Sequence, residues 1–217
     1  MNSYDNFFKS FDIDEFDFYE WGISATIFPD ISDIEKEWEK LKYRLFHDQD
    51  VYIRGYGRDA HGTNLFFELH KYIFNNSHVN KDRTNNLQPT KLIEGMTKLR
   101  KNKEIFNYQI SHIWGHTKNA LLFTAPWNIC YTPKIIDPFT GHEAVGRYPD
   151  EYKCLFLSET FSKYKDFISD YNNILLEYHV KEKIIEYVNS LRGRIDEKTL
   201  TRFLSDAIDE FSPIVST

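Results

Sequence analysis

The chain has 217 residues, of which 41% are hydrophobic and 17% aromatic, with a net charge of −6. This composition is sufficient for a folded domain with its own core and argues against disorder. No apolar run approaches the roughly 20 residues needed to span a bilayer, and the acidic, aromatic start lacks the regions of a signal peptide. The cysteines Cys130 and Cys154 form no CxxC pair, which excludes a zinc knuckle and makes a disulfide framework unexpected. We therefore expect a cytoplasmic protein without a membrane partner.

Charge is distributed unevenly along the chain. Residues 1–50 carry a net charge of −8, residues 51–147 carry +6 and residues 148–217 carry −4. We interpret the chain as one domain with three regions: an acidic N-terminal arm and helix (1–50), a basic α+β catalytic core (51–155) and a C-terminal helical region (156–217). A basic centre is compatible with a polyanionic partner, because phosphate contacts are local. Ordinary variation in surface charge is the simpler explanation of this pattern taken alone.

The first half of the chain is expected to be mainly helical. Residues 1–30 mix aromatic and acidic residues without a period and are expected to form an arm that packs on the body. Ser32 and Glu35 form a capping box ahead of a helix over 33–47, and Thr63 begins a second helix. The remaining elements expected here are a strand at 51–54, a polar loop at 75–86 and a helix at 90–101 opened by Pro89.

The second half is expected to contain most of the strands. Its expected elements are strands at 105–113, 121–124, 129–136 and 152–158, a short helix carrying His142, a helix from 160 to 191 with a break near 171–173, and a last helix capped by Asp196. Helices, a β-hairpin with a short helix, and further helices follow one another along the chain. This order predicts the α+β class, with the hairpin embedded in a mainly helical domain.

The residues best suited to catalysis or metal binding concentrate in residues 107–147. His112, His116 and His142 fall in this segment, with Asn128 between them. Histidine changes charge near neutral pH and also binds metals. Hydrolysis of a phosphodiester needs a base to activate water, a cation to neutralise the phosphate, and a group that orients both. His112, at the end of a predicted strand, is the candidate base, and Asn128 would tie down the loop that carries it.

The same segment also offers candidate ligands for a cation. His142, at the start of the predicted short helix, and Asp137, which precedes it, are the candidate metal ligands. A histidine near a helix N-terminus is disfavoured as a cation, which suits a neutral imidazole bound to a metal. The candidate contacts to nucleic-acid phosphates are Arg54, Arg58, Lys118, Lys134 and His116.

The order strand, histidine, loop, asparagine, helix, histidine over 105–147 resembles the HNH, or ββα-metal (His-Me finger), nuclease motif. SHIWGHTKN, PWN and GH carry the resemblance, which covers about a fifth of the chain. It implies a ββα-metal-like core, one divalent ion (Mg²⁺ or Mn²⁺), a histidine base and endonucleolytic cleavage of DNA, in many members for restriction or defence. The segment departs from the motif in two places. Ser111 stands where an acidic residue or a histidine usually precedes the first histidine, and the interval from Asn128 to His142 is longer than usual.

Each candidate also has a structural interpretation. A strand-end histidine such as His112 is commonly a structural hydrogen-bonding group, and Asp209 and Glu210 are expected to lie on solvated surface. Two alternatives to the nuclease therefore stay open: a non-catalytic nucleic-acid-binding or regulatory protein with structural histidines, and an interaction module that docks a partner through residues 1–30. A palindromic target would call for a symmetric homodimer, for which the helices after Thr160 offer an interface.

Overall fold

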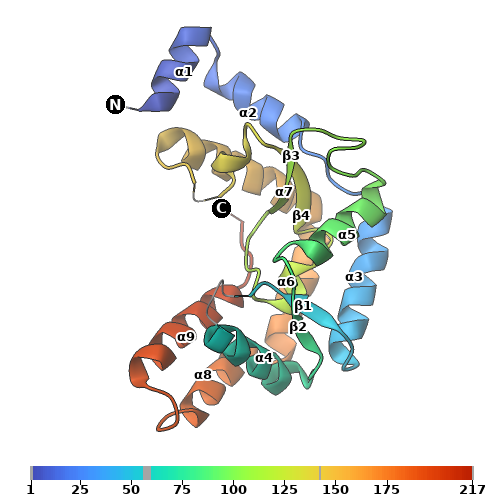
Figure 1. The fold of residues 1–217 in the computed structure, drawn as a ribbon, viewed down its shortest axis with the longest axis vertical. Coiled ribbons are helices and arrows are strands. Elements are labelled where there is room, and N and C mark those ends of the chain that lie inside the picture. The colour runs from blue at the N-terminus through green and yellow to red at the C-terminus, as the bar shows by residue number, and fades with distance from the viewer. Residues whose placement is uncertain (1, 56–59, 142, 217) are drawn as a thin grey trace.

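The computed structural model describes residues 2–55, 60–141 and 143–216, and Figure 1 shows their arrangement. The predicted α+β class is confirmed, because helices surround two small sheets of two strands each. The helices are α1 (Ser3–Phe11), α2 (Glu15–Ser24), α3 (Ile31–Phe46), α4 (Ala60–Phe74), α5 (Leu87–Thr97), α6 (Ala120–Phe123), α7 (Arg147–Glu177), α8 (Val180–Ser190) and α9 (Glu197–Glu210). The strands are β1 (Val51–Ile53), β2 (Val79–Lys81), β3 (Tyr108–His112) and β4 (Ile129–Pro133), and a 3₁₀ helix covers Asp137–Phe139.

Helices form both ends of the molecule, and the strands lie between these ends with α3 and α5 alongside them. Figure 1 shows α1 and α2 at one end and α4, α8 and α9 at the other. Helix α7 packs against α2 and the 3₁₀ helix, and also against α8. It therefore links both ends, although Tyr164 has non-helical backbone angles and kinks it. In the described part of the chain, no helix is both long and apolar enough to cross a membrane.

Helix α3 shows how the apolar pattern generates the core. Ile34, Trp38, Leu41 and Leu45 recur at helical spacing, and all four are buried, as the pattern predicts. The expected capping box is wrong, because the helix begins at Ile31 after an extended Asp30 N-cap. The Asp30 carbonyl accepts from the backbone nitrogens of the first turn, which places Ser32 inside the helix.

The two sheets differ in direction and in how well the sequence predicts them. Strands β3 and β4 are antiparallel, with His112 opposite Ile129 at the end of the pair. Strand β1 pairs in parallel with β2, and Val51 lies opposite Val79. Strand β2 lies inside the segment expected to be a polar loop. Its sequence is only VNK, which is too short for a strand pattern, and the pairing with β1 defines it as a strand.

Several expected elements have a different structure. Residues 121–124 were expected to be a strand, but Asn119 caps the short buried helix α6 at this point. Residues 152–158 belong to α7, because Tyr152, Phe156 and Thr160 are buried at intervals of four, which places them on one helical face. A short apolar run does not distinguish a buried strand from a buried helix. The helix expected to carry His142 is not formed by its described neighbours, Gly141 and Glu143.

The arm and the C-terminal region agree better with the sequence. Tyr4 packs edge-on against Phe139 with ring centroids 4.7 Å apart, so the N-terminal aromatics do cover the body. The helical break expected near 171–173 is wrong, because α7 continues through these residues; the helix is instead kinked at Tyr164 and ends before His179, whose φ is 50°. Asp196 caps α9 as expected, because its side chain accepts from the backbone nitrogen of Thr199.

Candidate functional site

The candidate base, His112, occupies the last position of β3, as the sequence predicts. Its Nε2 lies 2.9 Å from the carbonyl oxygen of Phe123, and its ring stacks on the Phe123 ring with centroids 5.5 Å apart. A carbonyl oxygen can only accept, so Nε2 carries the proton and donates it to Phe123. This tautomer leaves a lone pair on Nδ1, which has no hydrogen-bond partner among the described residues.

The surroundings of His112 keep the imidazole neutral. Burial lowers the pKa of His112 from 6.5 to about 4, the hydrogen bond to Phe123 opposes this shift, and the nearby charge of Arg54 lowers the pKa further. Arg54 lines the same pocket as His112. The backbone nitrogen of Arg54 also donates to the Thr117 carbonyl at 2.8 Å. The end of β1 is therefore attached to the loop that follows His112.

Asn128 holds this loop in place. Its side chain is fully buried. The Oδ1 atom accepts from the backbone nitrogen of Trp114 at 2.9 Å, and Nδ2 donates to the carbonyls of Gly115 and Leu122 at 3.2 and 3.0 Å. One amide thus connects the loop after β3 to the turn after α6, directly before β4. The sequence predicts this role, in which the asparagine positions the loop that carries the base.

Asp137 is attached to β3 through an interaction that the sequence does not predict. The hydroxyl of Ser111 donates to Oδ1 of Asp137 at 2.5 Å. Ser111 is the residue at which the chain departs from the nuclease motif. It does not supply a metal ligand of the motif, but its hydroxyl donates to the candidate ligand Asp137. Oδ2 of Asp137 takes part in no described hydrogen bond.

A cleft of about 790 Å³ collects four of the predicted residues. Arg54, His112, His116 and Asp137 all line it, together with Ser111. These residues come from the end of β1, from β3 and the loop after it, and from the 3₁₀ helix. Tertiary packing thus brings a candidate base, a candidate ligand and a candidate phosphate contact into one solvent-filled space.

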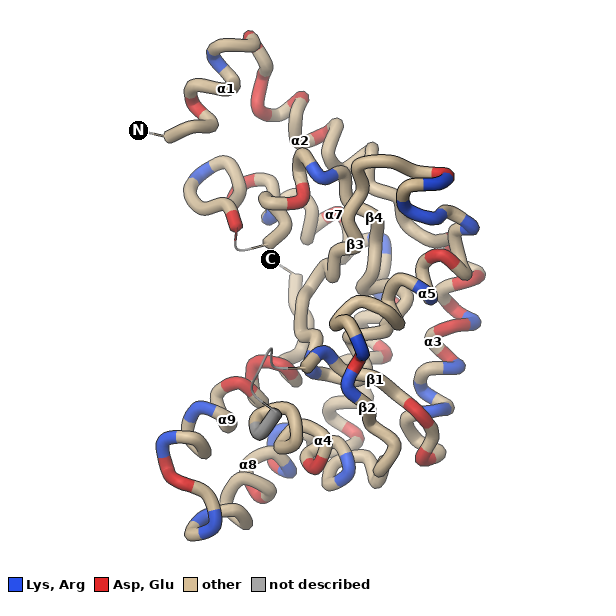
Figure 2. Tube along the Cα trace, in the orientation of Figure 1, with Lys and Arg blue, Asp and Glu red and all other residues tan. Residues whose placement is uncertain are grey.

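The cleft also contains charged residues that the sequence does not single out. Its described lining includes two basic residues (Lys or Arg) and four acidic residues, so the cleft carries a net negative charge. The residues outside the prediction are Glu143, Lys153, Asp209 and Glu210. Figure 2 shows acidic residues at the end of α9 that approaches the strands. No motif in the sequence signals this contribution, since α9 joins the cleft only through the tertiary fold.

Glu210 corrects the expectation that the end of α9 is solvated surface. It is only 9% exposed, and its Oε2 accepts from the backbone nitrogen of Lys118 at 2.8 Å. Its Oε1 lies 3.7 Å from Nζ of Lys118. Burial raises the pKa of Glu210, and the interactions with Lys118 oppose that shift. Lys118 therefore anchors α9 to the loop and is committed to a carboxylate, which differs from its predicted role as a phosphate contact.

The remaining predicted residues lie outside this arrangement or cannot be placed. Lys134 is exposed after β4 and does not line the cleft. His142 and Arg58 lie outside the described residues. Over residues 2–55, 60–141 and 143–216, no three or more His, Cys, Asp or Glu side chains form a group that could hold a metal ion. His116 remains in the cleft, and burial lowers its pKa against the opposing charge of Asp209.

His70 provides a structural comparison for His112. It is fully buried, its Nδ1 lies 2.6 Å from the Phe66 carbonyl, and its Nε2 accepts from the backbone nitrogen of Ala120 at 3.0 Å. Both ring nitrogens are therefore occupied, as in a structural core histidine. His112 differs because it uses one nitrogen for structure and lines a cleft.

The described fold and cleft define an α+β protein with a histidine, an arginine and carboxylates around one solvent-filled site. The family model described as "Uncharacterised protein PM1201" matches residues 29–216. The chain is also 38% identical to an uncharacterised protein PM1201 of Pasteurella multocida (strain Pm70), over 98% of this chain and 97% of that protein. The chain therefore belongs to the PM1201 family. No solved structure matches it.

Proposed function

We propose that this protein is a cytoplasmic, divalent-metal-dependent endonuclease of restriction or defence type that hydrolyses DNA phosphodiester bonds, with His112 as the general base. The single observation that carries the proposal is the state of the His112 ring. Its Nε2 proton is committed to the Phe123 carbonyl at 2.9 Å, so that Nδ1 keeps a lone pair on a residue that lines the cleft. A general base needs such a fixed tautomer and access to water.

The proposed step balances as follows. A water molecule loses a proton to Nδ1 of His112, and its oxygen forms a bond to phosphorus. The P–O bond on the opposite side of phosphorus breaks, and the departing oxygen takes a proton from solvent. Arg54, which lines the same cleft, would contact the phosphate. A bound phosphate anion would raise the pKa of His112, because a nearby negative charge favours the imidazolium form. Substrate binding would therefore strengthen a base that burial weakens.

The potential metal ligands in the cleft are compatible with a hard divalent ion. Mg²⁺ is usually held by one or two carboxylates and otherwise by water and substrate phosphate. Asp137 and Glu143 both line the cleft, and these two carboxylates would hold the ion, with His142 as a further candidate outside the described residues. When bound, the ion would neutralise charge on the phosphate. The cleft has more acidic than basic residues. These carboxylates alone would repel DNA, so a bound cation would be needed to bring the phosphate close.

The test compares two substitutions of the base. His112→Gln keeps an amide donor able to reach the Phe123 carbonyl but has no titratable nitrogen, whereas His112→Ala removes both functions. We expect each variant to lose about a hundredfold to ten-thousandfold in DNA cleavage with Mg²⁺ or Mn²⁺. The Gln variant should melt at nearly the wild-type temperature. His78→Ala, a change at a histidine whose side chain is 57% exposed, is the matched control and should cleave normally.

Two outcomes would reject the proposal. Cleavage by His112→Gln at the wild-type rate would show that His112 is not the general base. Wild-type protein that binds DNA in Mg²⁺ or Mn²⁺ without cutting it would instead identify the alternative, a non-catalytic nucleic-acid-binding protein.

A further inference from the structure

A second concave site lies between α3 and α5, separate from the cleft. This groove, of about 420 Å³, is lined by one face of each helix. From α3 come residues at intervals of three and four, and from α5 come residues with the same spacing. The basic residues that line the groove are Lys36, Lys40, Arg44, Lys91 and Lys98. Only Asp33 and Glu37 oppose them, so the groove carries a net positive charge of three, whereas the cleft is acidic.

The two carboxylates are already engaged by their own helix. Asp33 lies 3.6 Å from Lys36, and Glu37 lies 2.7 Å from Lys40. The other three cations form no ion pair within the described chain. These unpaired cations are Arg44, Lys91 and Lys98. They supply the excess charge that an anion would neutralise.

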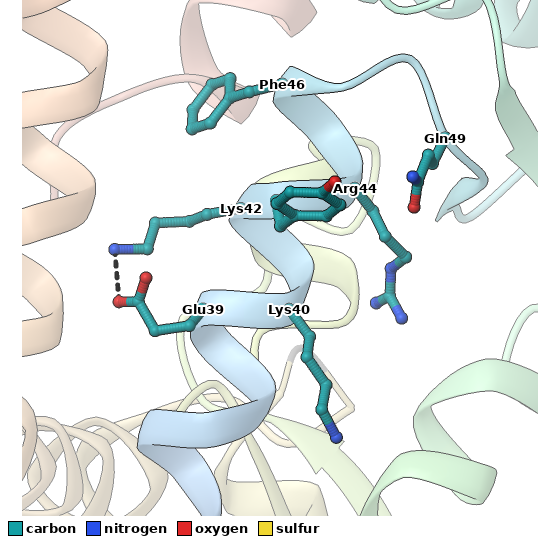
Figure 3. Close-up of a pocket in the computed structure, with 7 residues that line it drawn as sticks. Glu39, Lys40, Lys42, Arg44, Phe46 and Gln49 are labelled. Atoms are coloured by element: carbon teal, nitrogen blue, oxygen red, sulfur yellow. Dashed lines mark ion pairs between the residues drawn. The ribbon is translucent and has the colours of Figure 1, made fainter.

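Arg44 is the cation with the most unusual surroundings. Its Nε atom is buried and has no hydrogen-bond partner among the described residues. Figure 3 shows Lys40 and Arg44 extending on a different side of α3 from the paired Lys42 and Glu39. The helix therefore separates a neutralised side from a side whose charges face the groove.

The groove is elongated, and some of its lining residues lie close to lining residues of the cleft along the chain. Lys36, Lys40 and Arg44 extend over about 12 Å of helix, at 1.5 Å per residue. This length matches about three to four phosphates of one strand of duplex DNA, at 3.4 Å per charge. Tyr52 lines the groove and Arg54, two residues further on, lines the cleft. Thr124 also lines the groove, directly after the Phe123 carbonyl that binds His112.

We propose that the groove between α3 and α5 binds the phosphate backbone of nucleic acid and leads the strand toward the cleft. The two sites differ in charge: the positively charged groove would bind the polyanion, whereas the negatively charged cleft would not attract it without a cation. Binding in the groove needs no metal ion and no reaction in the cleft. The inference therefore stands or falls independently of the proposed nuclease activity.

The experiment measures binding of the full chain to a short fluorescent DNA duplex in EDTA, by anisotropy, from about 50 to 200 mM salt. The test variant is Arg44→Gln with Lys91→Gln and Lys98→Gln. Each lost phosphate contact should reduce the slope of log K against log salt by about 0.9, or by about 2.7 for the three. The double variant Lys91→Gln with Lys98→Gln changes only exposed residues and should lose about 1.8. It guards against misfolding of the triple variant.

The matched control removes three exposed lysines that do not line the groove, Lys165→Gln in α7, Lys181→Gln in α8 and Lys198→Gln in α9, and should keep the wild-type slope. An equal loss in the control and the test variant would overturn the proposal, because binding would then depend only on net charge. Wild-type protein that fails to bind DNA in EDTA would also overturn it. So would binding to anionic phospholipid vesicles without binding to DNA.

Discussion

Asn128 is the residue whose replacement tests the architecture of the site most directly. Its buried amide accepts one hydrogen bond from the backbone of Trp114 and donates two, to the carbonyls of Gly115 and Leu122. Asn128→Ala removes all three bonds. Asn128→Asp keeps the shape and the acceptor, but it turns the two donors into an oxygen that faces two carbonyl oxygens. The two variants therefore separate loss of the bonds from reversal of their polarity.

The expected size of each effect follows from these contacts. A net contribution of about 1 kcal/mol for each hydrogen bond gives about 3 kcal/mol for Asn128→Ala. Asn128→Asp should cost more, about 4 kcal/mol, because it buries a carboxylate with one oxygen facing two carbonyl oxygens. Total stability is usually about 5–15 kcal/mol, so either loss is a large fraction of it. The deficit of the Asp variant should shrink as the pH falls, since burial raises the pKa of the new carboxyl and protonation restores one donor.

Urea unfolding followed by circular dichroism measures these losses. With a slope of about 2 kcal/mol/M, Asn128→Ala should lower the midpoint by about 1.5 M. Asn173 in α7 is exposed, and its changes to Ala and Asp serve as controls that should stay within about 0.5 kcal/mol. A loss below about 1 kcal/mol for Asn128→Ala, or an Asp variant as stable as wild type, would refute the proposed role of the amide.

Three further predictions concern titration and capping. His70 has a pKa lowered to about 4 by burial, so the unfolded chain takes up the proton first. The free energy of unfolding should fall by up to about 1.4 kcal/mol per pH unit between about 6.5 and 4, with His112 acting in the same direction; urea titrations that show constant stability across this window would contradict it. For cleavage, kcat/KM should fall on acidification with a midpoint near pH 4 rather than near 6.5, because His112 is active as a base only when it is neutral. A midpoint at 6.5 would exclude His112 as the base. Asp196→Ala removes the cap of α9 and should cost about 1 kcal/mol in thermal unfolding, against no change for Glu197→Ala.

The candidate site was partly predictable from the sequence. His112 at a strand end and Asn128 after the loop follow from local order along the chain, and the structure places both as expected. The acidic end of α9 could not be predicted, because Glu210 reaches the loop from 92 residues away in the sequence. The same distance explains why Lys118, predicted to contact phosphate, is paired with a carboxylate. Long-range charge pairing leaves no periodic signal in the chain.

By itself, the sequence determined the elements with strong local patterns. The apolar stripe of α3 and the Asp196 cap of α9 act within a few residues, and both are formed as predicted. Tertiary structure decided the ambiguous segments. The run at 152–158 became helix because its residues pack at helical spacing, and β2 became a strand because β1 lies beside it. It also decided that cations from the acidic N-terminal region and from the basic middle region line the α3–α5 groove together, while acids line the cleft, because electrostatics depends on distance in space and not on position along the chain.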